Sequence, residues 1–301
     1  MQRIVQCVPN ISEGRNEEVV KAVVDSLRNV ADVKLLDWSS DADHNRSVIT
    51  FVGTPEGVEE GAMALCRKAS ELIDMSVHSG EHPRMGAMDV VPFIPIQGVT
   101  MEETVELARR VGKRIGEELG IPVYLYENAA TTPANRNLAS VRRGQYEGLP
   151  KKMASESGKP DFGPTVFNPK SGATAVGARM PLIAFNVNLG TDNIDIANQI
   201  ARNVRHASGG LKAVKAMGVK LEARGIVQVS MNMVNYKETP LYRVVELIRA
   251  EARRYGVNII GSEIIGLVPL EALVQSLDYY LGLEEFSRNQ ILETRLWSHE
   301  E

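Results

Sequence analysis

The sequence has few cysteines, no excess of basic residues and no long apolar run. Only two cysteines, Cys7 and Cys66, occur among its 301 residues, too few for a metal site built from cysteines alone. Each stands beside apolar residues, which indicates buried, unreactive thiols in a reducing compartment. The formal net charge is −4, whereas a nucleic-acid binder usually carries a clear basic excess. We therefore expect no nucleic-acid partner.

The chain also lacks the signals of membranes, of secretion and of several common enzyme classes. No segment reaches the roughly 18 consecutive apolar residues of a membrane span. The N-terminus leads directly into a strand-like segment without the apolar region of a signal peptide. A cytoplasmic protein with no membrane partner is therefore expected. A G-x-G-x-x-G fingerprint, a P-loop and a G-x-S-x-G elbow are all missing, which argues against nucleotide-dependent and serine-hydrolase chemistry.

Short β-rich runs alternate with amphipathic segments along both halves of the chain. Residues suited to cap a helix precede the amphipathic segments at Asn16, Thr54 and Thr100. A helix pattern, a glycine and a strand pattern follow one another at 101–126 and again at 240–260. This repeat predicts an α/β (α+β) fold of two similar subdomains, 1–180 and 181–301. Each is expected to be a β-sheet backed by helices, with a ferredoxin-like or split βαβ topology.

Two stretches of the first half have an unusual composition. Residues 89–96 are β-rich but contain Pro92 and Pro95, which cannot donate to a strand ladder, so an edge strand or a ligand-facing rim is expected. Residues 127–180 are rich in Gly, Pro, Asn, Ser and Arg, and only short pieces look helical. A long irregular segment in a compact protein is usually a binding loop or a linker. The aromatic and small residues of 161–179 favour binding.

The densest group of polar residues lies in a loop at 74–86. Two of the five histidines, an acid and an arginine fall within seven residues: His78, Glu81, His82 and Arg84. One histidine could act as a general acid and base, because an imidazole with a pKa near 6.5 exchanges protons at neutral pH. The pair could instead bind a metal ion, although Gly80 and Pro83 break the helix that this spacing needs. Alternatively, both histidines simply satisfy backbone groups of the loop.

Two further polar loops follow the ends of predicted strands. In 8–16, which contains Asn10, a strand leads into a helix, where backbone N–H groups and the helix dipole favour anions. Arg15 could pair there with a carboxylate, and a capped turn is the equal alternative. In 39–46, Arg46 or His44 could contact a substrate, and a hairpin turn explains the same residues.

Five segments, in order along nearly the whole chain, resemble the formiminotransferase domain of the glutamate formiminotransferase family. They are CVPNISEGRN (7–16), HSGEHPRMGA (78–87), PDFGP (160–164), LIAFNVNL (182–189) and GLVPL (266–270). The resemblance implies transfer of the formimino group of N-formimino-L-glutamate to N5 of tetrahydrofolate, in histidine degradation. It also implies a homodimer and two α/β subdomains with folate in a tunnel between them.

The resemblance also assigns site residues. His82, in the Gly-Glu-His-Pro-Arg context, matches the catalytic histidine of the family. The loop that contacts folate matches Gly163, Pro164, Thr165, Val166, Phe167, Asn168, Pro169, Lys170, Ser171 and Gly172. Ser171 departs from the family pattern, which has a tryptophan before the final glycine, so folate affinity or orientation could differ. The candidates for substrate binding are Asn10, Arg15, Arg46, Glu81 and Arg84, and no metal is expected.

A single imidazole suits this chemistry, because the attacking N5 amine loses a proton and the departing glutamate nitrogen gains one. Glu81 or Asp89 could stabilise the cationic amidine. Because the ligands are polyanions in an acidic protein, positive charge must be local, at the arginines of the polar loops.

Several other functions stay open. One is formyl transfer from N-formylglutamate to tetrahydrofolate. Another is a metal-dependent amidine or amide hydrolase that uses His78 and His82, and a third is a non-catalytic folate carrier. Some family members fuse a cyclodeaminase domain, for which 301 residues leave no room. We therefore expect a single-activity enzyme, and a separate cyclodeaminase as a partner stays open.

Overall fold

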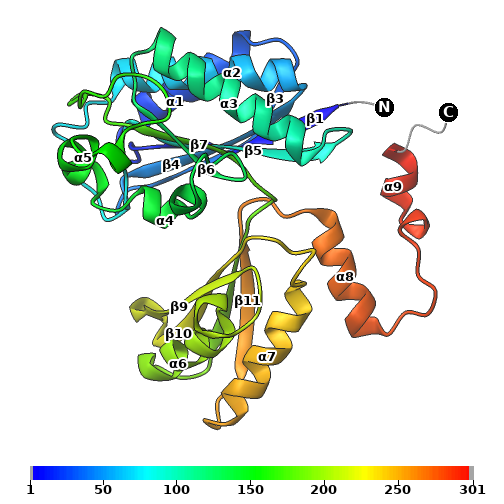
Figure 1. The fold of residues 1–301 in the computed structure, drawn as a ribbon. Coiled ribbons are helices and arrows are strands. Elements are labelled where there is room, and N and C mark those ends of the chain that lie inside the picture. The colour runs from blue at the N-terminus through cyan, green and yellow to red at the C-terminus, as the bar shows by residue number, and fades with distance from the viewer. Residues whose placement is uncertain (1–2, 298–301) are drawn as a thin grey trace. The chain divides into compact units, whose positions relative to one another are not determined.

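The computed structural model describes residues 3–297 and falls into two compact units, Met1–Arg179 and Met180–Glu301 (Figure 1). Each unit has its own β-sheet with helices packed on it. The predicted mixed fold of two sheet-and-helix subdomains is thereby confirmed. No helix in the described ranges has the length and apolar character that a membrane span needs.

The N-terminal unit is built on one mixed sheet. Its elements are β1 (Ile4–Cys7), β2 (Asn10–Ile11), α1 (Glu17–Asp25), β3 (Val33–Asp41), β4 (Arg46–Gly53), α2 (Pro55–Leu72), β5 (Met88–Gln97), α3 (Met101–Glu118), β6 (Val123–Glu127), α4 (Leu138–Val141), α5 (Gln145–Met153) and β7 (Thr174–Ala178). β1 and β2 act as one interrupted strand, because both pair with β4 and β5. The sheet order is β3, β4, β1/β2, β5, β7, β6, with β7 parallel to both of its neighbours.

Helices cover the two faces of this sheet unequally. Apolar residues of α1, α2 and α3 form the main core against one face. A smaller cluster joins Val141 of α4 and Leu149 and Met153 of α5 to Val90 and Tyr124 on the other face. Figure 1 shows α4 and α5 on the opposite side of the sheet from α1, α2 and α3.

The C-terminal unit is built on an antiparallel sheet. Its elements are β8 (Ile183–Leu189), α6 (Ile194–Val204), β9 (Val214–Leu221), β10 (Ile226–Met233), α7 (Leu241–Arg253), β11 (Ile259–Ile265), α8 (Leu270–Leu281) and α9 (Leu292–Trp297). The strand order is β11, β8, β10, β9. Apolar residues of α6 and α7 form the core with the inward side chains of β8 and β10.

The same βαββαβ arrangement occurs in both units. The order β3, β4, β1/β2, β5 in one sheet corresponds to β9, β10, β8, β11 in the other. This split βαβ topology agrees with the predicted repeat. The paired segments differ from those expected, however, because the counterpart of α7–β11 is α2–β5. The helix and strand at 101–126 are α3 and β6, which extend the N-terminal unit beyond the repeat, and their similarity to 240–260 is a local helix–glycine–strand pattern.

The expectation that 89–96 forms an edge strand is wrong. β5 lies inside the sheet, between β1/β2 and β7. Pro92 lies beside the break between β1 and β2, where its carbonyl accepts the Val8 N–H at 3.2 Å. Pro95 lies opposite Val5, where the register of the β1–β5 ladder shifts. Both prolines are tolerated because the neighbouring ladder is already irregular there.

Part of the small-residue stretch is a buried strand and not a binding loop. Every residue of β7 is buried, and β7 lies between β5 and β6. At Gly177 a Cβ atom would come within 2.6 Å of the Tyr126 ring. Small residues here therefore allow close packing inside the sheet.

The predicted helix caps are confirmed. The Asn16 side chain accepts the N–H of Val19, and the Thr54 side chain accepts that of Gly57. Thr100 forms a complete capping box with Glu103. These signals are local, so the sequence alone was enough to find them.

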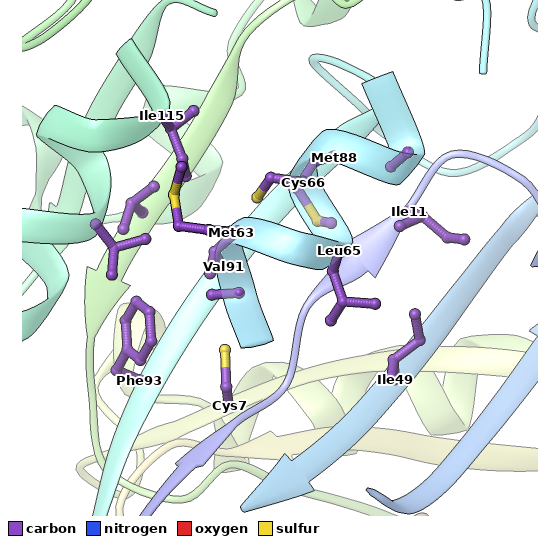
Figure 2. Packing of buried hydrophobic residues seen from close by; sticks show 14 of the residues in the cluster. Cys7, Ile11, Ile49, Met63, Leu65, Cys66, Met88, Val91, Phe93 and Ile115 are labelled. Atoms are coloured by element: carbon purple, nitrogen blue, oxygen red, sulfur yellow. The ribbon is translucent and has the colours of Figure 1, made fainter. Parts of the chain in front are cut away.

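Both cysteines lie in the main core of the N-terminal unit, among Leu65, Val91 and Phe93 (Figure 2). Each is free and has no exposed surface. Burial raises the pKa of the Cys66 thiol to about 12 and, aided by Cys66 nearby, raises that of Cys7 well above its ordinary value. Both groups are therefore uncharged at neutral pH.

The two thiols should resist alkylation while the protein is folded. At about pH 8 the thiolate fraction of Cys66 should be on the order of 10³-fold below that of a free cysteine, and that of Cys7 should be strongly lowered as well. A pulse of N-ethylmaleimide followed by mass spectrometry should leave the native protein unlabelled and label both sites in denaturant. Native labelling at the rate of glutathione would show that the core is open to solvent.

Candidate active site

The polar loop predicted to carry chemistry connects α2 to β5, and we call residues 73–87 the His82 loop. Backbone hydrogen bonds tie it to two neighbours. Glu81 N–H donates to Asp43 O at 3.3 Å, in the turn between β3 and β4. Met75 N–H donates to Lys170 O, and Ala87 N–H to Ser171 O, both at 2.9 Å. The structure therefore places the His82 loop between the β3–β4 turn and the end of the predicted folate loop.

The imidazole of His82 lies between an arginine and a carboxylate. Its Nδ1 is 3.5 Å from Arg46 Nη1, and its Nε2 is 3.7 Å from Asp89 Oδ2. The side chain is 13% exposed. Burial lowers the pKa of His82, and Arg46 lowers it further against the opposing effect of Asp89. The ring is therefore uncharged at neutral pH and can accept a proton.

Asp89 is a buried carboxylate at the start of β5. Its Oδ1 accepts the Met85 N–H at 2.8 Å, and its Oδ2 contacts Arg142 Nη2. Burial alone would raise the pKa of Asp89, but Arg142 and then His82 outweigh it and hold that pKa below its usual value. Asp89 is thus a fixed negative charge facing His82 Nε2, which favours the tautomer with its proton on Nε2.

Arg46 is partly buried and has no carboxylate ion-pair partner among the described residues. Among residues 3–297 no carboxylate forms an ion pair with it, and its buried Nε has no hydrogen-bond partner. Burial lowers the pKa of Arg46, although a guanidinium stays charged at neutral pH. A half-buried cation beside His82 Nδ1 suits an anionic ligand.

The two other candidate arginines are placed differently. Arg84 is buried and pairs with Glu147, at 2.6 Å and 3.0 Å. Arg15 is exposed, and its Nε donates to the carbonyl of Ala42 at 2.8 Å. Arg84 therefore holds the loop together, while Arg15 lies at the surface.

The remaining candidates, Asn10 and Glu81, lie near the site without contacting His82. Asn10 is a residue of β2, opposite Val48 and Val90, and its side chain donates to Val8 O at 3.3 Å. Glu81 is exposed at the tip of the His82 loop.

His78 has a structural environment. Its Nε2 is 3.1 Å from Asn45 O, and its Nδ1 accepts from Arg84 Nε at 3.3 Å. Both ring nitrogens therefore have protein partners, unlike the arrangement in which His78 and His82 would share a metal ion. Within the described part of the chain, no group of three or more His, Cys, Asp or Glu side chains could hold a metal.

The predicted folate loop, 163–172, packs beside the His82 loop. Asn168 Oδ1 accepts the N–H groups of Lys170 and Ser171, at 3.1 Å and 3.0 Å. Gly86 and Gly172 form a backbone bridge between the two loops. Residues 163–166 remain exposed.

Phe167 and Ser171 anchor the folate loop. Phe167 packs on Tyr146 with ring centroids 5.3 Å apart. Ser171 is only 6% exposed, so a small buried residue occupies the position before Gly172.

Two family models match the chain. The formiminotransferase domain, N-terminal subdomain, matches residues 4–179, and the formiminotransferase domain matches residues 184–295. The chain belongs to the formiminotransferase family. The predicted resemblance is thereby confirmed, and the boundary between the two family models falls beside the boundary between the two compact units.

Curated formiminotransferase relatives are similar over nearly the whole chain. The glutamate formimidoyltransferase of Streptococcus pyogenes serotype M1 is 55% identical over 98% of this chain and 99% of that protein. That of Thermoplasma acidophilum is 50% identical over 97% of each. The formimidoyltransferase-cyclodeaminase of Mus musculus is 46% identical over 98% of this chain and 57% of its own length.

Sequence reasoning missed Arg142 and Asn45. Arg142 lies 53 positions from Asp89 in the sequence, and no local pattern connects them. Asn45 joins two polar loops, because its side chain accepts the Gly14 N–H and donates to Ser79 O, both at 2.9 Å. Its φ is 48°, a conformation that asparagine tolerates in turns. The asparagine between two predicted strands was therefore the available sequence signal.

The contact between the two loops should depend on Gly86. A Cβ atom there would lie 2.4 Å from the carbonyl oxygens of Ser171 and Ala173. Gly86→Ala should therefore cost about 1–3 kcal/mol in the free energy of unfolding, measured by urea denaturation. Gly148→Ala is the control, because nothing lies within 4 Å of a Cβ at this position in α5. It should gain about 0.5–1 kcal/mol, and equal stability of the two variants would contradict the tight contact.

Proposed function

We propose that this chain is a glutamate formimidoyltransferase, which transfers the formimino group of N-formimino-L-glutamate to N5 of tetrahydrofolate. The observation that carries the proposal is the position of His82 between Arg46 and Asp89. The names of the relatives support formimidoyl rather than formyl transfer. The two nitrogens of His78 are engaged elsewhere, which disfavours the metal-dependent hydrolase.

His82 performs the proton transfers of the reaction. The N5 amine attacks the amidine carbon and forms a new C–N bond, and the Nδ1 of His82 takes the proton that N5 loses. The same proton then goes to the glutamate nitrogen as its bond to the carbon breaks, so the imidazole returns to its neutral state. Asp89 faces Nε2 at 3.7 Å, which favours Nδ1 as the basic atom.

Arg46 binds the α-carboxylate of the donor. That carboxylate is attached to the carbon that bears the formimino nitrogen, so it must lie close to the reacting atoms. The Arg46 Nη1 is 3.5 Å from His82 Nδ1, so the guanidinium lies beside the atom proposed to accept the proton. Among the described arginines of the three polar loops, Arg46 alone is half-buried beside the imidazole without a carboxylate partner.

The folate loop, residues 163–172, contacts the acceptor. Its support is the backbone bridge between Gly86 and Gly172, which holds it beside the His82 loop, together with the exposure of 163–166. Holding both substrates on adjoining loops removes much of the entropy cost of their encounter.

Two proposals concern partners. The product carries an amidine on folate, which a deaminating, ring-closing enzyme must consume, and relatives such as the Mus musculus protein carry cyclodeaminase in their names. We therefore propose that a separate cyclodeaminase consumes the product. We also propose a homodimer, whose interface would cover exposed leucines of α8 such as Leu277 and Leu281, 47% and 64% exposed.

Replacing the proposed acid–base residue should abolish most turnover. His82→Ala should lower kcat by about 10²- to 10⁴-fold, measured by formation of 5-formiminotetrahydrofolate. His206→Ala, in the C-terminal unit, is the control and should stay near the wild-type rate. Near-wild-type turnover by His82→Ala would exclude the acid–base role, and no turnover by the wild type would favour a folate carrier.

Removing the unpaired guanidinium should weaken donor binding. Arg46→Gln should raise the KM for formiminoglutamate about 10- to 100-fold, because a charged hydrogen bond contributes about 1.5–3 kcal/mol. Arg15→Gln should leave that KM within about twofold, since an exposed charge contributes little. The assignment is wrong if Arg15→Gln raises the KM and Arg46→Gln does not.

A further inference from the structure

Arg142 reaches the site from a segment far along the chain. It follows α4 directly, and its Nη2 contacts the same oxygen of Asp89, Oδ2, that faces His82. The side chain is 15% exposed. The contact of Oδ2 with Arg142 is much closer than its 3.7 Å separation from His82 Nε2. Arg142 is therefore the main partner of the carboxylate.

The backbone that carries Arg142 is held firmly. Asn137 caps the start of α4 by accepting the Ala139 N–H at 3.1 Å. The half-buried Lys152 of α5 donates to the Val141 carbonyl at 2.6 Å, and Val141 is buried in the apolar cluster formed with α5. The position of the guanidinium is thus fixed from the face of the sheet opposite to the main core.

Charged groups from several elements surround the His82 ring. Arg46 comes from β4, Asp89 from β5 and Arg142 from the end of α4. The ring of His44, in the β3–β4 turn, has its centroid 6.4 Å away, and it pairs with Asp41 at 3.0 Å. Of these groups, Asp89 alone favours a proton on His82. Arg142 is the group that neutralises Asp89.

We propose that Arg142 is a positioning residue of the transfer reaction. By pairing with Asp89 it fixes the carboxylate that orients His82 and cancels its charge, so the imidazole is held in place yet remains unprotonated. Without Arg142, the charge of Asp89 would be unopposed, and the imidazole beside it would hold a proton at a higher pH. The enzyme would then lose its base. This role rests on the proposed function of His82 as the general base.

The test is the titration of His82 in the unliganded full chain. Isotope-labelled histidine gives a signal for each of the five histidines, and His82→Gln identifies the one that belongs to His82. Arg142→Gln should move the titration midpoint upward by about one pH unit. The pKa on the acid side of the pH profile of kcat/KM, below which the base is protonated, should rise by a similar amount.

Three variants keep the test decisive. Arg142→Lys should keep the titration midpoint close to that of the wild type. Arg143→Gln, which removes an exposed charge from the next position, should also titrate as the wild type. Asp89→Asn should move the midpoint downward, because Arg46 and Arg142 then act unopposed. An unchanged or lowered midpoint in Arg142→Gln would overturn the proposal even if activity fell. Because the titration needs no substrate, it stands even if the chain fails to use formiminoglutamate.

Discussion

The buried carboxylate of Asp89 is the constraint on which the site depends. A charge with 1% exposure is costly unless it is paired and hydrogen-bonded. It recruits the Met85 N–H from the His82 loop, Arg142 from the segment after α4, and the His82 ring. Because Asp89 lies near the start of β5, a strand inside the sheet, its position is fixed relative to three separate parts of the chain. The hydrogen bonds and charge pairing of Asp89 hold the His82 loop, balance the local charge and orient the His82 ring.

The repeated topology separates the elements common to both units from those that the N-terminal unit carries in addition. In the C-terminal unit the connection from α7 to β11 is the short stretch 254–258, while the corresponding connection from α2 to β5 is the long His82 loop, 73–87. The N-terminal unit also carries α3, β6, α4, α5 and β7 beyond the shared βαββαβ core. The segments between these added elements carry the predicted folate loop and Arg142. The candidate site therefore combines strands of the shared core, which carry Arg46 and Asp89, with segments that distinguish the two units.

Interactions between residues close in the sequence could be predicted from it, and interactions between distant residues could not. The caps at Asn16, Thr54 and Thr100 depend on residues within one helical turn, and the identity of the His82 loop depends on a contiguous motif. The inner position of β5 and the burial of β7 depend on which strands become neighbours. The ion pair of Arg142 with Asp89 joins residues 53 positions apart. Hydrophobic periodicity and secondary-structure propensity carry no information about which strands become neighbours or about this ion pair.

Three arginines in three polar loops had equal claims on an anionic ligand when only the sequence was considered. Their counterions separate them. Arg84 already has Glu147, and Arg15 lies in solvent, where a charge pairs weakly. Arg46 combines partial burial with the absence of a carboxylate partner among the described residues, so a bound carboxylate would relieve its desolvation. The electrostatic cost of Arg46 in the unliganded protein is the physical reason to place the substrate there.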